Sequence, residues 1–406
     1  MLLTPSYPDD HPEDPASWLA VPIAGIFGAN ASGKSNVLHA ISYMRDLVRG
    51  SLRDSDDPVG VTRYPFALDM NSHLETSSYV VDILIDNVQH SYGFTVDDIG
   101  IVEEWLHTYP HRRKRVVFHR EGNVFEWGES TTAQLRKYAD DLESNVLFLS
   151  VAGRFKLSET QSTFDWFRRI RTSFALQTLP TGIYFEQLSR RLGTRDLDVM
   201  TTILRAADTG IDAVSLIEES DDEWAARKAR RAALANSPKR KFMQLLHRGE
   251  AGATYPLEFR DQSLGTQSLM ELSVLALNAL SSGSVLIVDE IDRSLHSFLS
   301  SQIIGLFRNP ETNRTGAQLI FSSHDSALFG HIQGTEVLRR DHIWFTQKND
   351  CGETELFPIT AFKPRKEDNR ERRYLAGRYG AVPIVRDEMF VAALAARNKE
   401  QRPQDA

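Results

Sequence analysis

The chain has 406 residues, of which 41% are hydrophobic and 25% are charged, and its formal net charge is −8. This composition predicts a globular protein of two or three subdomains, and the charge excludes a global attraction to DNA or to anionic membranes. The single cysteine, Cys351, excludes an internal disulfide and fits a reducing cytoplasm. No apolar segment has the length and continuity of a signal peptide or a membrane span.

Residues 1–20 are predicted to form a loose arm, and residues 21–57 a strand, a loop and a helix. The loop from Gly28 to Ser35 reads Gly-Ala-Asn-Ala-Ser-Gly-Lys-Ser, which matches the pattern G-x-x-x-x-G-K-[ST] at every fixed position. An apolar run precedes this loop, and an amphipathic segment from Asn36 to Val48 follows it. Such an order of strand, glycine turn and helix aims backbone N–H groups at phosphate oxygens.

The loop therefore predicts a site for ATP and Mg²⁺. Lys34 is expected to reach the outer phosphates, and the Ser35 hydroxyl is expected to bind Mg²⁺. The loop residues expected to contact the nucleotide are Gly28, Asn30, Ser32, Gly33, Lys34, Ser35 and Asn36.

From residue 58 to 128 the hydrophobic period changes to two, which predicts an antiparallel sheet with turns at Asp86-Asn87 and at Glu121-Gly-Asn. His107, His111 and His119 lie near one another, but no acid or cysteine at ligand spacing accompanies them, so a metal site is disfavoured. The basic run of residues 111–115 is interpreted as a solvated turn. The alternative is a contact with a phosphate backbone or with the acidic face of a partner.

Residues 129–250 are predicted to form a helical insert and a charged linker. An apolar stripe that includes Leu197, Met200 and Leu204 is closed by Gly210 and indicates a packed helix face. Residues 218–241 are acidic first and basic later, which is typical of a solvated helix and linker. The insert shows no sustained heptads and is too short for long coiled-coil arms.

Residues 251–362 hold the remaining candidate site residues, and residues 363–406 are predicted to be a basic cap and a disordered tail. The apolar run from Ser284 to Val288 predicts a strand buried on both faces. It ends in Asp289, which suits Mg²⁺, and Glu290, which suits activation of the attacking water. A further strand, from Gln318, ends in polar residues that include His324.

Three segments resemble motifs of ABC-type ATPases. Residues 261–267, with Ser263, Gly265 and Thr266 ahead of an apolar helix, resemble the signature motif. Residues 291–296, centred on Asp292, resemble the D-loop, and the segment ending at His324 resembles the switch-histidine segment. Each alone is more often a turn, a helix cap or a structural histidine, but their order and spacing relative to the phosphate loop and the acid pair favour the ATPase interpretation.

The order of parts resembles the ABC-class AAA ATPases related to the recombination-repair, chromosome-maintenance and overcoming-lysogenization heads, in particular AAA family fifteen with its RloA-like and AriA-like members. The match includes the phosphate loop, Glu104-Trp-Leu, Leu147-Phe-Leu-Ser, residues 289–296 and Arg373-Tyr-Leu-Ala-Gly-Arg-Tyr-Gly. The resemblance implies an α/β fold of the P-loop NTPase, ABC-ATPase type: a central mostly parallel sheet with an antiparallel β subdomain and a helical insert.

The chain departs from this family before the loop, where members usually carry a strand and an Asn-Phe-Arg-Ser-like segment. Either that first hairpin is reduced or the start is assigned too late, so the base-contacting residue is not assigned. The glutamine loop is not assigned either, because Gln89 lies in a predicted strand and fits an ordinary surface residue.

The resemblance also implies roles for the site residues. The nucleotide sits between two heads, with Lys34 on the phosphates, Ser35 and Asp289 on Mg²⁺, Glu290 polarising water and His324 stabilising the charge of the γ-phosphate. The residues implied to act at the interface with the neighbouring head are Ser263, Gly265, Thr266 and Asp292.

Sequence and resemblance together predict a cytoplasmic, Mg²⁺-dependent ATPase that acts as a switch in a homodimer of heads or a higher oligomer. Such chains often work with a separate effector, frequently a nuclease, in bacterial defence against phage, and no second catalytic centre is visible here. The main alternative is a DNA-repair or chromosome-maintenance ATPase that clamps DNA directly. A transporter subunit is disfavoured by the long insert and by the form of the loop, and no membrane contact is expected.

Overall fold

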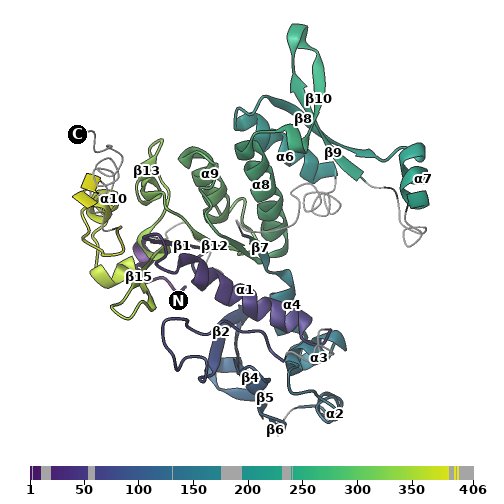
Figure 1. Ribbon diagram of the computed structural model, residues 1–406, viewed down its shortest axis with the longest axis vertical. Helices are drawn as coiled ribbons and strands as arrows, with labels where there is room; N and C mark the ends of the chain where they lie inside the picture. The colour runs from purple at the N-terminus through teal and green to yellow at the C-terminus, as the bar shows by residue number, and fades with distance from the viewer. Residues whose placement is uncertain are drawn as a thin grey trace, which may run out of the picture.

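The computed structural model describes residues 3–10, 20–53, 60–129, 131–174, 194–230 and 241–383, together with residues 1, 239, 388, 389, 391 and 392 (Figure 1). Its central sheet has six strands in the order β16-β15-β1-β12-β11-β7. Their bounds are β1 Ile23–Gly28, β7 Arg171–Ser173, β11 Val285–Val288, β12 Gln318–Ser322, β15 Ile343–Lys348 and β16 Thr354–Pro358. Every neighbouring pair is parallel except β15 with β16, which confirms the predicted mostly parallel α/β sheet.

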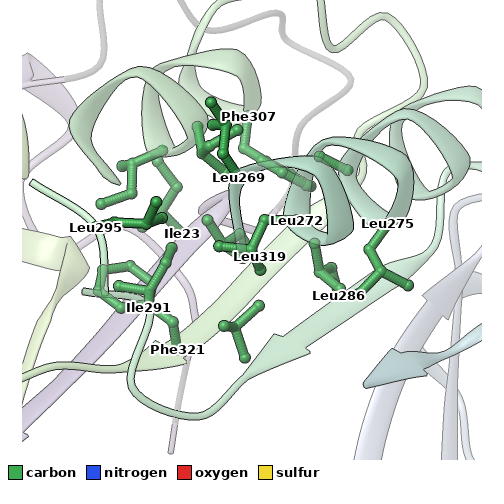
Figure 2. Close-up of a cluster of buried hydrophobic side chains, with 14 of the residues drawn as sticks. Ile23, Leu269, Leu272, Leu275, Leu286, Ile291, Leu295, Phe307, Leu319 and Phe321 are labelled. Atoms are coloured by element: carbon green, nitrogen blue, oxygen red, sulfur yellow. The ribbon is translucent and has the colours of Figure 1, made fainter. Parts of the chain in front are cut away.

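Both faces of this sheet are buried. Helix α1 (Lys34–Gly50) belongs to the core on one face, and α8 (Leu264–Ser282) and α9 (Ser297–Arg308) pack on the other. Alternate residues of each strand enter opposite cores, as the pleat requires; in β1, Ile26 joins the α1 side and Phe27 the α8 side. Figure 2 shows the α8 side, where side chains of the two helices and the strands interdigitate. Burial on both faces explains why β1 and β11 are continuously apolar and β12 nearly so, whereas the edge strands β7 and β16 carry polar residues.

The predicted antiparallel sheet has five strands in the order β2-β3-β4-β5-β6. Their bounds are β2 Ser77–Ile85, β3 Val88–Val96, β4 Ile101–Tyr109, β5 Arg115–Glu121 and β6 Val124–Trp127. The turn between β2 and β3 falls at Asp86 and Asn87, whose φ angles are 50° and 63°. Positive φ at both central residues is the geometry of the tightest hairpin turns, which is why an Asp-Asn pair stands there. Gln89 is exposed on β3.

Three helices connect this sheet to the central one: α2 (Ala133–Lys137), α3 (Phe148–Arg154) and α4 (Ser158–Arg169). The fully buried Glu104 of β4 accepts hydrogen bonds from the backbone N–H groups of Phe148 at 2.6 Å and Leu149 at 3.0 Å. Tyr92 donates to the same carboxylate at 3.0 Å, and Arg120 lies 3.7 Å away. Burial raises the pKa of Glu104, and Arg120 and the two backbone donors oppose that rise. Strand β4 and the start of helix α3 are thus joined through the Glu104 carboxylate.

Between residues 129 and 240 the helical prediction is wrong in two places. Besides α6 (Thr194–Ala206) and α7 (Asp221–Arg230), this stretch contains strand β7 of the central sheet and strand β8 (Ile211–Glu218). Strand β8 pairs with β9 (Lys241–Arg248), which pairs with β10 (Thr254–Glu258) in a separate three-stranded sheet. These short strands are held by partners distant in sequence, so no local period reveals them. The predicted stripe of α6 does pack inward, through Met200 and Leu204.

The lobe formed by β8, β9 and β10 projects from α6 and α8 (Figure 1). The charged stretch 218–241 is described only in part, and residues 231–238 and 240 lie outside the described residues. Within the described part, Glu219 is buried and pairs with Arg227 at 2.7 Å, so the stretch is not solvated throughout. The division of the chain into subdomains stays a prediction.

Three further described elements follow β12 in the chain. They are the hairpin β13 (His331–Ile332) and β14 (Thr335–Glu336), and helix α10 (Arg370–Leu375) of the predicted cap. Residues 3–10, predicted to be loose, are anchored instead: the backbone N–H groups of Ser6 and Tyr7 donate to Asp341. Asp10 pairs with Arg340 at 2.6 Å. The anchors lie more than 300 positions away in sequence, so composition did not reveal them. The rest of the arm, residues 11–19, and the tail from residue 393 lie outside the described residues.

Candidate functional site

The phosphate loop lies between β1 and α1, as predicted, and its shape is imposed by the hairpin β15–β16. Gly33 has a φ of 101° and directly precedes α1. A Cβ atom at Gly33 would collide with the Thr354 side chain, and one at Gly28 would collide with the Thr346 carbonyl. Ser32 hydrogen-bonds Thr346 side chain to side chain at 2.7 Å. Both glycines are therefore required by close approach of the hairpin, and Gly33 also by its positive φ.

The ammonium group of Lys34 lies among the backbone carbonyl groups of the phosphate loop. Its Nζ donates to the carbonyl oxygens of Gly28 at 2.9 Å and Ala29 at 3.1 Å, and lies 3.4 Å from His324 Nδ1. Burial lowers the pKa of Lys34, whereas the carboxylates of Glu290, Asp289 and Asp292 raise it. The Lys34 ammonium group is thus close enough to these three carboxylates for their charges to change its pKa.

Ser35 and Asp289 meet as the sequence predicts for a Mg²⁺ site. The Ser35 hydroxyl donates to Asp289 Oδ1 at 3.1 Å, and the Ser322 hydroxyl donates to the same oxygen at 2.6 Å. The donors are hydroxyl and carboxylate oxygens, the atoms that Mg²⁺ prefers, and a site with few protein ligands leaves room for phosphate oxygens and water. The residues present therefore fit Mg²⁺ bound together with a nucleotide.

Glu290 follows strand β11 and His324 follows strand β12, at the same end of the sheet as the phosphate loop. Glu290 adopts a φ of 55°, and its N–H donates to Ser322 Oγ at 2.8 Å. Its Oε1 lies 3.8 Å from His324 Nε2. A left-handed conformation in a residue other than glycine is a strained state that the surroundings must enforce, and such states concentrate at functional sites.

Asp292, the predicted D-loop residue, reaches the same cluster. Its Oδ2 accepts the His324 backbone N–H at 3.4 Å. Its Oδ1 is buried and finds no hydrogen-bond partner among the described residues. An unpaired carboxylate oxygen costs free energy unless a further group binds it.

The signature residues lie at the start of α8 and contact one another. Ser263 caps the helix by accepting the Thr266 N–H at 3.1 Å, and the two hydroxyls lie 2.9 Å apart. A Cβ at Gly265 would meet the Ser294 carbonyl at 2.8 Å, so the signature packs on the D-loop of its own chain. Leu264 between them is exposed. Asn30 and Asn36 of the loop are also exposed.

Sequence reasoning missed several residues that shape the site. Ser322 holds Asp289 and Glu290 together, and the polar pair Ser322-Ser323 at the strand end is the signal that could have identified it. Thr346 and Thr354 carry no local signal, since they act through sheet pairing. Ser173 also escaped notice; its carbonyl accepts the Asp289 N–H at 2.9 Å.

The other candidates give no metal site. No group of three or more His, Cys, Asp or Glu side chains within the described ranges is arranged to hold a metal ion. His119 Nε2 lies 2.9 Å from Glu103 Oε1, while His111 is exposed. Cys351 is an exposed free thiol. Of the helices that the structure describes, none combines the length and the apolar character needed to cross a membrane.

A phosphate loop after β1, an acid pair after β11 and a histidine after β12, the strand between them, are the features of a P-loop NTPase fold. The family model described as "AAA domain, putative AbiEii toxin, Type IV TA system" matches residues 23–330, well over half of the chain. The chain belongs to this family of AAA domains. The finer assignment to the RloA-like and AriA-like group stays a prediction.

Two solved structures are similar to the chain at low identity. One, described as "Crystal structure of the SmcHead bound to the C-winged helix domain of ScpA", is 13% identical with a TM-score of 0.42, over 84% of this chain and 91% of that chain. The other, the SMC head domain from Thermotoga maritima, is 11% identical with a TM-score of 0.35, over 82% of this chain and 89% of that chain. No curated protein matches the chain.

Proposed function

We propose that this chain is a Mg²⁺-dependent ATPase that works as a nucleotide-driven switch between two heads. The observation that carries the proposal is that Lys34, Asp289 and His324 lie together at one end of the central sheet. Lys34 Nζ lies 3.4 Å from His324 Nδ1, the residue after Lys34 donates to Asp289, and the residue after Asp289 lies 3.8 Å from His324. Lys34 begins helix α1, Asp289 follows strand β11 and His324 follows strand β12, so their convergence is a property of the fold and not of one motif.

Each residue has a role that follows from its contacts. An ammonium group has three N–H donors, and loop carbonyls take two of those of Lys34. The third lies near His324 Nδ1, 3.4 Å away, and would turn to an outer phosphate oxygen when a nucleotide is bound. No capping side chain binds the backbone N–H groups at the start of α1, so these groups are available for further phosphate oxygens. Ser35 and Asp289 would hold Mg²⁺, which supplies charge that neutralises the phosphates when bound.

Glu290 and His324 form the catalytic pair. Glu290 orients and deprotonates the attacking water, because its carboxylate projects past the end of β11 toward His324. His324 stands between this carboxylate and Lys34, where a donor can stabilise charge on the transferred phosphoryl group. The hydrogen bond from the His324 backbone N–H to the Asp292 carboxylate ties the D-loop to this position.

The signature acts on the nucleotide of a second head. Ser263, Gly265 and Thr266 lie at the start of a different helix, and their contacts in this chain go to one another and to Ser294. An exposed helix N-terminus is suited to bind a phosphate supplied by a partner. ATP would thus close two heads, and hydrolysis would release them.

We further propose that the switch is the sensor or motor subunit of a bacterial defence system against phage, in the manner of the RloA-like and AriA-like group, with a separate effector such as a nuclease. The family description names a toxin and a toxin–antitoxin system, which supports a role in bacterial conflict. The site described above is suited to nucleotide chemistry alone, so the destructive step would belong to the effector.

The first test is nucleotide binding by calorimetry and ATP turnover, with Lys34→Ala as the comparison. Removal of the loop's ammonium group should abolish binding or nearly so, because the outer phosphates lose their only mobile cation. Lys363→Ala, which removes an exposed lysine of the cap, is the matched control and should bind ATP normally. Unchanged ATP affinity in Lys34→Ala would refute the assignment of the site.

A further inference from the structure

Strand β7 is the edge of the central sheet and consists of only three residues. Among the strands that the structure describes, it pairs with β11 alone, with Ser173 opposite Val288. The carbonyl of Ser173 then accepts the N–H of Asp289 at 2.9 Å, one position beyond the paired residues. The backbone of the Mg²⁺-facing acid therefore rests on the last residue of a short edge strand. Few ladder bonds fix such a strand, so its position depends on side-chain anchors.

Two side chains grip β7, one from each face of the sheet. Arg45 of α1 donates to the Thr172 hydroxyl at 2.7 Å. On the other face, the Ser173 hydroxyl donates to Glu271 Oε1 of α8 at 3.0 Å. Successive residues of a strand point to opposite faces, so Thr172 and Ser173 serve the helices of the two layers separately.

Glu271 is an unusual residue for its place. It lies among the apolar residues by which α8 packs on the sheet, between the buried Met270 and Leu272. Burial raises the pKa of its carboxyl, and the Ser173 hydroxyl and Arg293 of the D-loop oppose that rise. A carboxylate in such a position costs free energy that an apolar side chain would not. Packing alone gives no reason for an acid there, whereas its contacts lead to the site.

Glu271 also belongs to the helix that begins with the signature. It follows Ser263 by about two helical turns along α8. The start of the same helix packs on the D-loop, through Gly265 against the Ser294 carbonyl. A displacement of α8 along its axis would therefore move both the signature and the carboxylate that holds Ser173.

We propose that Glu271 is a positioning residue for the Mg²⁺ site. Its carboxylate holds the Ser173 hydroxyl, the Ser173 carbonyl holds the Asp289 backbone, and the Asp289 side chain is thereby kept against Ser35. The same chain of contacts links the signature helix to the acid that faces Mg²⁺. This role rests on the proposed ATPase function and assigns to it a residue outside the loop, the acid pair and the signature.

The test measures how nucleotide binding depends on Mg²⁺, with a fluorescent ATP analogue titrated at a series of Mg²⁺ concentrations and in EDTA. Glu271→Ala should raise the Mg²⁺ concentration for half-maximal binding by about tenfold, the scale typical for loss of a group that orients a metal ligand. Binding in EDTA should be unchanged, since the loop is intact. Turnover of ATP should show the same shift in Mg²⁺ dependence.

Three further variants separate positioning from loss of structure. Glu271→Gln keeps an oxygen that accepts from Ser173 and should restore most of the Mg²⁺ dependence. Ser173→Ala removes only a hydroxyl and should reproduce the effect of Glu271→Ala, and the double variant should be no worse than either single one, because the two act in one chain of contacts. Glu311→Ala, which removes an exposed carboxylate, should behave as the wild type.

Each outcome decides the matter. An unchanged Mg²⁺ dependence in both Glu271→Ala and Ser173→Ala, in a wild-type background that binds nucleotide, refutes the positioning role and leaves the ATPase proposal intact. Additive effects in the double variant refute the shared chain of contacts. A wild-type protein that binds no nucleotide refutes the ATPase proposal, and with it this role. If Glu271→Ala does not fold, Ser173→Ala and Glu271→Gln give the answer.

Discussion

Glu290 combines a strained backbone conformation with the proposed role of catalytic base. Its φ of 55° turns the chain sharply after Asp289, so that two consecutive acids serve different purposes. Asp289 turns back to Ser35 and Ser322, whereas Glu290 faces His324. In an extended strand, successive side chains would point to opposite faces of the sheet, so the two carboxylates could not both face the site. The hydrogen bond from the Glu290 N–H to Ser322 stabilises the turn.

Glu290→Gln should bind ATP as the wild type does but hydrolyse it far more slowly, by about 10²-fold or more, because the shape is retained and the base is lost. Single-turnover hydrolysis and calorimetry measure the two effects separately. The variant should also accumulate in an ATP-bound, associated form, visible by light scattering. Turnover within a few-fold of the wild type would show that Glu290 is not the base.

The residues that the sequence identifies at this scale are those with fixed local spacing. Lys34 and Ser35 follow from one loop pattern, and Asp289 and Glu290 from the end of an apolar run. The partners that complete their geometry could not be found in this way. Ser322, Thr346 and Ser173 reach the site through strand pairing, and pairing between strands far apart in sequence leaves no spacing to read. The roles of all these residues in turnover stay predictions.

Elements with regular periods were predicted well, and short elements were not. The five antiparallel strands have a period of two over long runs, and the turn at Asp86-Asn87 marks their register. Strand β7, with three residues, is too short to have a period, and β8 lies within a charged and mixed stretch. Both were assigned to helices because the elements around them are helical. Their strand conformation comes from tertiary pairing, which overrides local preference.

The antiparallel sheet contains a buried titratable group whose effect on stability has a definite sign. Burial lowers the pKa of His107 from 6.5 to about 4, with Lys114 and His119 adding to the effect. His107 Nε2 has no hydrogen-bond partner among the described residues. The unfolded chain takes up this proton near pH 6.5, and the folded chain only near pH 4. Stability is therefore full above the higher value and falls as the pH drops between the two.

We expect the free energy of unfolding, measured in urea, to fall on acidification by up to about 3 kcal/mol from this group alone. His107→Phe, which does not titrate, should lose less stability than the wild type between about pH 7 and about pH 4.5. His111→Phe changes an exposed histidine of the turn between β4 and β5 and should retain the wild-type slope. Equal slopes in the wild type and His107→Phe would contradict the assignment.

At the scale of the whole molecule, the proposal of two heads makes a claim about which chain supplies which group. Lys34 and the signature lie on different elements, and the exposed Leu264 lies at the centre of the signature. If the signature acts across an interface, a defect in the loop and a defect in the signature can be separated between two molecules.

Lys34→Ala and Ser263→Arg chains are each expected to be inactive alone. A mixed dimer has one site with both defects and one with neither, so mixing should restore up to about half of the activity per mixed dimer if the sites are independent. The measurement is ATPase rate against the mixing ratio. A rate per molecule that is independent of concentration, in a protein that stays monomeric, would overturn the two-head arrangement.

The crowding of the phosphate loop by the hairpin β15–β16 has a consequence for how the chain is made. Strand β1 is synthesised well before its two neighbours in the sheet, β12 and β15, which follow it by roughly 300 residues. Until then neither edge of the apolar strand β1 has a partner strand. Thr346 and Thr354, which lie against Gly28 and Gly33, have also not yet been synthesised. Such long-range closure is slow and exposes strand edges to aggregation. A nascent chain therefore carries its most recognisable motif long before that motif can have its native shape.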